Sequence, residues 1–186
     1  MKIMKTFIIT MLIALSFFNC KAQTVNLSTY NPSANDKSGK YYKDIDGNFD
    51  PFLGVWKNTT GSTTFKVELF KEVIPQGDSP FDYSYDTIQG KYYLIENEGL
   101  IDENIICIGE NMVKVGYVII AKSNDGVSMN GVIYDTCIPD DLNSTFGELK
   151  MDITATNTAH WTITRKGMKL VGMNYVIPTN IILTKQ

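Results

Sequence analysis

Oxygen-bearing side chains near the start of the chain have a spacing that could hold a calcium ion. They stand at every second position from Asp44 to Asp50, with Gly47 among them. Calcium loops of the EF-hand type need glycine at the sixth position and glutamate at the twelfth. Here Gly47 comes two positions early and Val55 occupies the twelfth position. We therefore expect no metal site, but a solvated turn in which Asp50 caps a short helix.

His160 is the only histidine of the chain. A single imidazole cannot build a histidine-based metal site, and a catalytic imidazole needs a nucleophile and an orienting acid. Alternation along the strand around it puts His160 on the face opposite Trp161, which is the better candidate for the core. We therefore expect His160 on the outer face, without a role in chemistry.

Acidic residues gather in two places and could form a pair of catalytic carboxylates. These residues are Glu96, Glu98, Asp102 and Glu103, followed later by Asp140 and Asp141. Glycosidases need two carboxylates at a defined separation, but acidic pairs in loops are usually only solvated. The sequence has no Gly-x-Ser-x-Gly elbow, no phosphate-binding glycine loop and no His-Glu-x-x-His motif. We expect a protein that is not an enzyme and that needs no cofactor.

Tyrosine is plentiful in the segments that read as strands. Nine tyrosines lie in or near them: Tyr41, Tyr42, Tyr83, Tyr85, Tyr92, Tyr93, Tyr117, Tyr134 and Tyr175. Aromatic side chains at the mouth of a barrel can bind apolar ligands. Aromatic residues are also good strand formers, which accounts for most of the enrichment.

The first 22 residues predict export. Lys2 and Lys5 precede a short apolar run, and small residues at Cys20 and Ala22 fit cleavage before Gln23. This is the pattern of a secretory signal peptide over residues 1–22, and its apolar run is too short for a permanent membrane anchor. The alternative is a lipoprotein anchored through Cys20, although the residues before Cys20 suit that processing poorly. We expect a periplasmic or secreted protein without a transmembrane segment.

Cys107 and Cys137 remain after removal of the leader, and an even pair in an exported protein predicts a disulfide. The alternative is two buried free thiols. The chain has 17 basic and 20 acidic residues, and removal of Lys2, Lys5 and Lys21 leaves 14 basic residues against the 20 acidic ones. No basic run is interleaved with aromatics, so nucleic acid is excluded as an expected partner.

The elements that must position these residues are strands. Residues 23–50 are polar and without sustained periodicity, so we expect a loosely held N-terminal arm. Within residues 51–186 the hydrophobic period is two, clearest at Phe65–Leu69, Leu149–Ile153 and Trp161–Ile163. Asn124-Asp125-Gly126 is typical of a tight hairpin turn. About nine short strands predict an all-β domain, either an antiparallel β-barrel or a β-sandwich.

Gly54 and Trp56 follow one expected helical turn that begins at Asp50-Pro51. This opening resembles the Gly-x-Trp start of lipocalin-type barrels. In that family the tryptophan closes the barrel floor beneath a basic side chain, which the resemblance assigns here to Arg165 or Lys185.

The chain also resembles a family of uncharacterised exported Bacteroidetes proteins, domain of unknown function 6705. The residues that carry this resemblance are Tyr42-Lys43-Asp44, Asp50-x-Phe52-x-Gly54-x-Trp56, Asp86–Tyr93, Ile177–Asn180 and Leu183–Gln186. This resemblance implies an exported β-rich domain, and it assigns no activity to the chain.

Two functions follow as expectations. The first is a lipocalin-like barrel that binds a small apolar or amphipathic ligand, and the second is a module with a packed core that binds another envelope or secreted protein. The inward residues distinguish the two, because a filled barrel leaves no room for a ligand. The side chains that decide this are Phe65, Leu69, Met151, Ile153 and Trp161.

Overall fold

A computed structural model describes residues 23–31, 37, 39–77, 82–100, 104–109, 118–137, 145–165 and 175–186. The predicted leader with Cys20 lies outside these residues, as do Tyr117, the side chain of Arg165, and four of the acidic residues named above: Asp102, Glu103, Asp140 and Asp141. The described part contains no helix long and apolar enough to cross a membrane.

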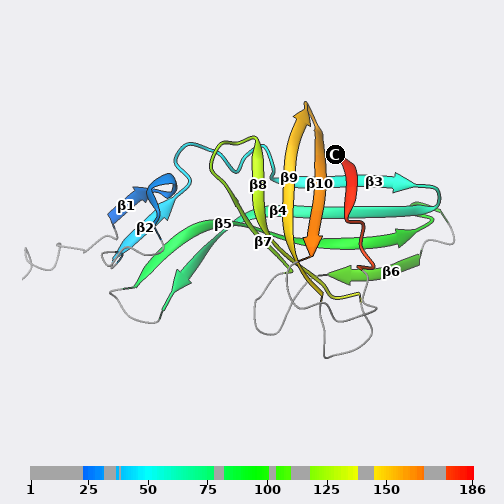
Figure 1. The fold of residues 1–186 in the computed structure, drawn as a ribbon, viewed down its shortest axis with the longest axis horizontal. Helices are drawn as coiled ribbons and strands as arrows, with labels where there is room; N and C mark the ends of the chain where they lie inside the picture. Colours follow the sequence, from blue (N-terminus) through cyan, green and yellow to red (C-terminus); the bar gives the residue numbers. More distant parts are fainter. Residues whose placement is uncertain are drawn as a thin grey trace, which may run out of the picture.

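Strands make up most of the described chain (Figure 1). The elements are β1 (Gln23–Asn26), the 3-10 helix η1 (Leu27–Thr29), β2 (Lys40–Lys43), β3 (Gly54–Thr60), β4 (Thr63–Gln76), β5 (Tyr83–Glu96), β6 (Asn104–Gly109), β7 (Ile119–Ser123), β8 (Ser128–Asp135), β9 (Thr145–Ala155), β10 (Thr158–Arg165) and β11 (Asn180–Lys185).

Eight of these strands close into an antiparallel barrel, so the all-β prediction is confirmed and the barrel replaces the sandwich. The order is β5-β4-β3-β11-β10-β9-β8-β7, and β7 pairs back onto β5. In Figure 1, β3, β4 and β5 run across the view and β8, β9 and β10 stand upright, so the two halves of the barrel cross. Closure leaves these strands fewer free edges that could pair with other chains.

β5 and β7, whose pairing closes the barrel, meet at Gly90, which lies opposite Ile119. A Cβ atom at Gly90 would lie 2.6 Å from Cδ2 of Leu69 and 2.8 Å from the carbonyl oxygen of Glu68. Only glycine fits there, because any side chain would push β4 and β5 apart.

The predicted alternation gives the barrel its interior. Phe65, Val67 and Leu69 are buried on β4, and the intervening Lys66 and Glu68 are more exposed. The largest fully buried side chains are Trp56, Trp161, Tyr92, Phe49, Phe52, Phe65, Ile88, Ile119, Met129, Ile133, Leu149 and Met151. Of the five inward residues expected to fill the barrel, Ile153 alone is only half-buried.

The described part of residues 23–50 differs from the loosely held arm expected there. β1 pairs with β2 in parallel, and β2 pairs in parallel with β5 through Tyr41 and Tyr42. Leu27 and Tyr42 are buried in the main apolar core. Strands of four residues are too short to show a period, and the partner of β2 lies far along the chain, so the sequence pattern could not reveal this sheet extension.

The predicted turn at Asn124-Asp125-Gly126 is confirmed, and Asn157 marks a second turn of this kind. Gly126 has a φ of +69° between β7 and β8, and Asp125 accepts hydrogen bonds from the backbone N–H groups of Val127 and Ser128. Asn157 has a φ of +60° between β9 and β10. Hairpin turns of this kind require such left-handed residues.

Candidate ligand-binding site

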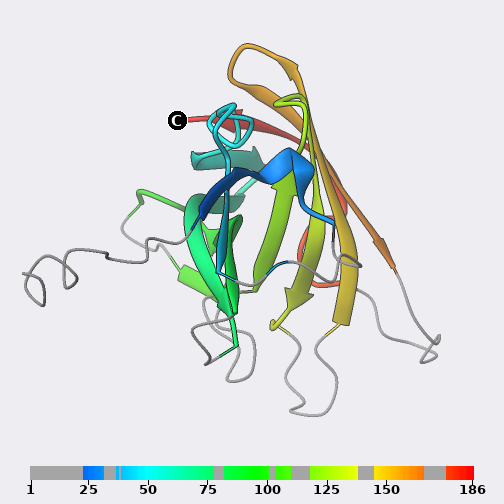
Figure 2. The ribbon, with the colours of Figure 1, turned by 90° about the vertical axis from the view of Figure 1, so that its left-hand side faces the viewer.

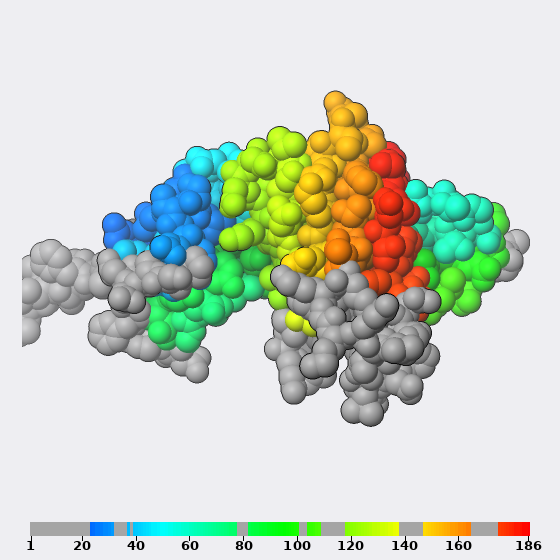
Figure 3. All heavy atoms as spheres, in the orientation of Figure 1, coloured from blue at the N-terminus to red at the C-terminus, as the bar shows by residue number. Residues whose placement is uncertain are grey.

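A pocket of about 300 Å³ lies on the outside of the barrel, beneath the N-terminal segment. It is lined by Leu27, Tyr30, Tyr85, Asp86, Thr87, Ile120, Ala121, Lys122, Asn130, Gly131 and Val132. In Figure 3 the blue N-terminal residues border the yellow-green residues of β7 and β8, and Figure 2 shows the blue segment crossing these strands. The volume is at the lower end of the range for small-molecule sites.

Strand alternation turns the lining side chains outward. Ile120 and Lys122 alternate with Ile119 and Ala121, which face the interior. On β8 the outward residues Asn130 and Val132 pair with Lys122 and Ile120, so the four side chains share one face. The pocket floor is therefore the outer surface of the barrel wall, and Leu27 and Tyr30 form the opposite wall.

Three further tyrosines, one on β2 and two on β5, extend the wall that Tyr30 begins. The ring centroid of Tyr30 lies 5.0 Å from that of Tyr42, 5.8 Å from that of Tyr83 and 5.7 Å from that of Tyr85. These distances are those of favourable aromatic pairs. The Nζ atom of Lys37 lies 5.3 Å from the ring centroid of Tyr83. We call Tyr30, Tyr42, Tyr83 and Tyr85 the tyrosine cluster.

The hydroxyl groups of Tyr30 and Tyr85 stay protonated at neutral pH. Burial raises the pKa of Tyr30 well above its usual value, and the hydrogen bond with Tyr83 raises that pKa further. The Tyr30 and Tyr83 hydroxyl oxygens lie 3.1 Å apart. Burial and then the neighbouring Tyr83 also raise the pKa of Tyr85. Tyr30 and Tyr85 therefore present neutral aromatic rings with hydroxyl groups that can donate and accept hydrogen bonds.

Asp86 fastens the N-terminal segment to β5. Its side chain is 2% exposed, and it accepts hydrogen bonds from the Tyr41 hydroxyl at 2.5 Å and from the Asp44 backbone N–H at 2.9 Å. Burial, followed by this hydrogen bond with Asp86, raises the pKa of Tyr41 to about 12. Both carboxylate oxygens of Asp86 are thus satisfied within the protein.

The Asp44–Asp50 run forms a turn, and the short helix expected after Asp50 is not formed, because residues 48–52 remain in turn conformation up to β3. The Asp44 carboxylate accepts hydrogen bonds from the backbone N–H groups of Asn48 and Phe49, as a turn cap does. The Asp46 carboxylate accepts a hydrogen bond from Asn26. Within the described residues no group of three or more potential ligands could hold a metal ion.

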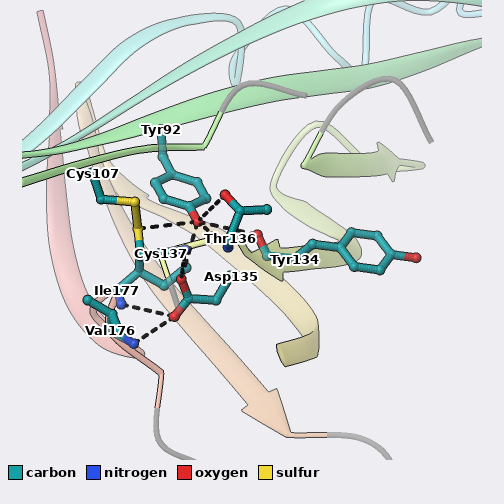
Figure 4. Close-up of a disulfide and its surroundings, with 8 residues drawn as sticks. All are labelled: Tyr92, Cys107, Tyr134, Asp135, Thr136, Cys137, Val176 and Ile177. Carbon is teal, nitrogen blue, oxygen red and sulfur yellow. Dashed lines mark hydrogen bonds between the residues drawn. A yellow bond between two sulfur atoms is a disulfide. The ribbon is translucent and has the colours of Figure 1, made fainter. Parts of the chain in front are cut away.

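Cys107 and Cys137 form a disulfide that joins β6 to the end of β8, with Cα atoms 5.6 Å apart (Figure 4). Beside it lies Asp135, which is fully buried. The Asp135 carboxylate accepts hydrogen bonds from the Cys137 and Val176 N–H groups, at 3.0 and 2.6 Å. The Tyr92 hydroxyl points into the same cluster, and burial raises the pKa of Tyr92 to about 12. These contacts hold the chain together at this end of the barrel.

Gly54 and Trp56 lie at the start of β3. Trp56 is 1% exposed, and its indole N–H donates to the Phe52 carbonyl at 2.7 Å. The Nζ atom of Lys185 lies 5.3 Å from the Trp56 ring centroid and donates to the Pro51 carbonyl. Gly54 has a φ of +112°, and a Cβ atom there would touch the Lys185 stem at 3.4 Å. Lys185 is thus a basic cover of Trp56.

The remaining candidates lie apart from one another. The Nε2 atom of His160 lies 2.7 Å from Oδ1 of Asn180 on the outer face, and the neighbouring Ala159 and Trp161 are buried, as predicted. Glu98 forms an ion pair with Lys57, which lowers the pKa of Glu98. Glu96 is exposed at the end of β5.

Sequence reasoning missed the N-terminal wall of the pocket. Tyr30 lies in a polar segment without the pattern of a strand, and no motif marks Leu27 or Lys122 as part of a site. The signal that could have found the wall is the period-two placement of Tyr83 and Tyr85, which puts two tyrosines on one face of a strand.

Comparison with known proteins identifies the family to which the chain belongs. No curated protein and no solved structure matches the chain. The model of the family of unknown function DUF6705 matches residues 4–186. Because this match spans nearly the whole sequence, the chain belongs to the family of unknown function DUF6705.

Proposed function

We propose that this chain is an exported, non-catalytic binding protein that holds a small apolar or amphipathic ligand on the outside of its barrel. The observation that carries the proposal is the pocket between the N-terminal segment and the β7–β8 face. Concave, mainly apolar surfaces with a few polar groups are the usual form of small-molecule sites.

The packed interior supports an outer site. Phe65, Met151 and Trp161 each have 2% or less of their surface exposed, and all three belong to the central apolar core. A lipocalin-like ligand inside the barrel would have to displace such side chains, which close-packed interiors resist. The outer pocket is already open and needs no such displacement.

A second candidate is a module that binds another envelope or secreted protein. The specific observation in its favour is β6, where Ile105, Ile106 and Ile108 are 49, 47 and 43% exposed. Exposed apolar residues that gather on one strand are typical of interaction surfaces. In this reading the outer pocket would have no small-molecule ligand.

N-phenyl-1-naphthylamine tests the proposal, because this neutral, apolar molecule fluoresces when it leaves water. We expect saturable binding to the protein purified from cells that express residues 1–186. Val132→Trp should weaken this binding about tenfold or more, because the indole would occupy the pocket, a loss of about 1.4 kcal/mol. Val132 is half-buried and outward-facing on β8, where an aromatic residue suits a strand.

Ile182→Trp is the matched control, because Ile182 is an exposed β-branched residue on β11. It should leave the affinity of the probe unchanged. Equal affinity of wild type and Val132→Trp, with both variants folded by circular dichroism, would contradict the outer site. Failure of the wild type to bind the probe would favour the interaction module.

A further inference from the structure

The two charged side chains that line the outer pocket differ in whether their polar atoms are still available to a ligand. Two ionisable side chains with opposite charges line it, Asp86 and Lys122. Asp86 is buried, and both its oxygens accept hydrogen bonds from within the protein. Its two oxygens are therefore already occupied by partners in the Tyr41–Asp44 segment.

Lys122 differs from Asp86 both in its exposure and in its lack of partners within the part of the chain that the structure describes. Its side chain is exposed on the outer face of β7, opposite Asn130, and it forms no ion pair with any residue that the structure describes. Most other lysines on the barrel wall have acidic partners, such as Lys57 with Glu98 and Lys150 with Asp152. Lys122 is thus a cation at the pocket whose ammonium group has no partner among the described residues.

The surfaces around Lys122 are apolar or aromatic. Leu27 and Tyr30 form one wall, and Ile120 and Val132 form the floor. The Asn130 amide beside Lys122 adds donors that also suit an anion. A cation at the edge of an apolar pocket favours a ligand that has an apolar body and a negative group at one end.

We infer that the pocket takes an organic anion with a ring-bearing or otherwise apolar body. The anionic group meets Lys122 and Asn130, and the body lies between Tyr30 and Val132. This inference rests on the proposed function and specifies the ligand class. The chain has more acidic than basic residues, so most of its surface disfavours an anion. Binding of an anion is therefore specific to the pocket at Lys122.

Two probes with one ring system separate the inference from the proposed function. 8-Anilinonaphthalene-1-sulfonate has the rings of N-phenyl-1-naphthylamine and an added sulfonate. We expect Lys122→Met to weaken binding of the sulfonate probe about three- to fivefold, the scale of a partly exposed ion pair. Binding of the neutral probe should change less than twofold. Higher salt should weaken the sulfonate probe in wild type and not in Lys122→Met.

Lys66→Met is the control for loss of one positive charge, because Lys66 lies on β4 and does not line the pocket. It should leave both affinities unchanged, and Lys122→Arg should retain binding of the sulfonate probe. If Lys122→Met binds both probes as wild type does, the inference of an anionic ligand is wrong and the proposed function stands. If wild type binds neither probe, both are wrong.

Discussion

At the residue scale, Trp56 is the side chain that stabilises the end of the barrel where β3 begins. Its ring is buried, its N–H is bound to Phe52, and Lys185 covers it from the last strand. Trp56 and Lys185 are register partners where the first barrel strand, β3, pairs with the last strand, β11. Gly54 is part of the same arrangement, because it lies beside Lys185 and its φ of +112° is one that residues with a side chain rarely adopt.

Trp56→Ala should lower the free energy of unfolding by about 3 to 5 kcal/mol, the range for loss of a large buried aromatic side chain. Lys185→Met should lower it by about 1 kcal/mol or less, because an exposed cation–π contact is worth little. Urea unfolding of the two variants checks both values. A loss below 1 kcal/mol for Trp56→Ala would show that Trp56 does not hold this end of the barrel.

At the element scale, the strands that could be predicted are those with one buried face and one solvent-exposed face. Phe65, Val67 and Leu69 alternate with polar residues, so their strand and its inward face follow from the sequence. β1 and β2 could not be predicted, because each has four residues and its pairing depends on a distant partner. The pocket escaped prediction for a related reason, since its walls come from η1, β5, β7 and β8.

The disulfide belongs to this scale, because it joins two strands that do not pair with each other. It closes a loop with a sequence separation of 30 residues, so Cys107→Ser with Cys137→Ser should cost about 3 to 4 kcal/mol in the chain-entropy account. Peptide mass spectrometry after thiol labelling of the unfolded protein checks the bond itself. Cys107 and Cys137 should label only after reduction, and labelling without reductant would rule the bond out.

At the scale of the whole molecule, the barrel is a filled support, and the proposed binding surface lies on its outside. Its interior is occupied by residues such as Met151 and Trp161, and the N-terminal segment adds the second wall that a barrel surface alone would lack. Asp86 holds that segment in place. The proposed export through residues 1–22 would place this site outside the cytoplasm, where it would meet small molecules of the envelope or the medium.

The measurement that tests this account most directly is a crystal structure of the protein with N-phenyl-1-naphthylamine bound. The account predicts density for the probe between Tyr30 and Val132, with the barrel interior unchanged. Density inside the barrel beside Met151 and Trp161 would contradict it, because the protein would then bind its ligand as an ordinary lipocalin-like barrel does.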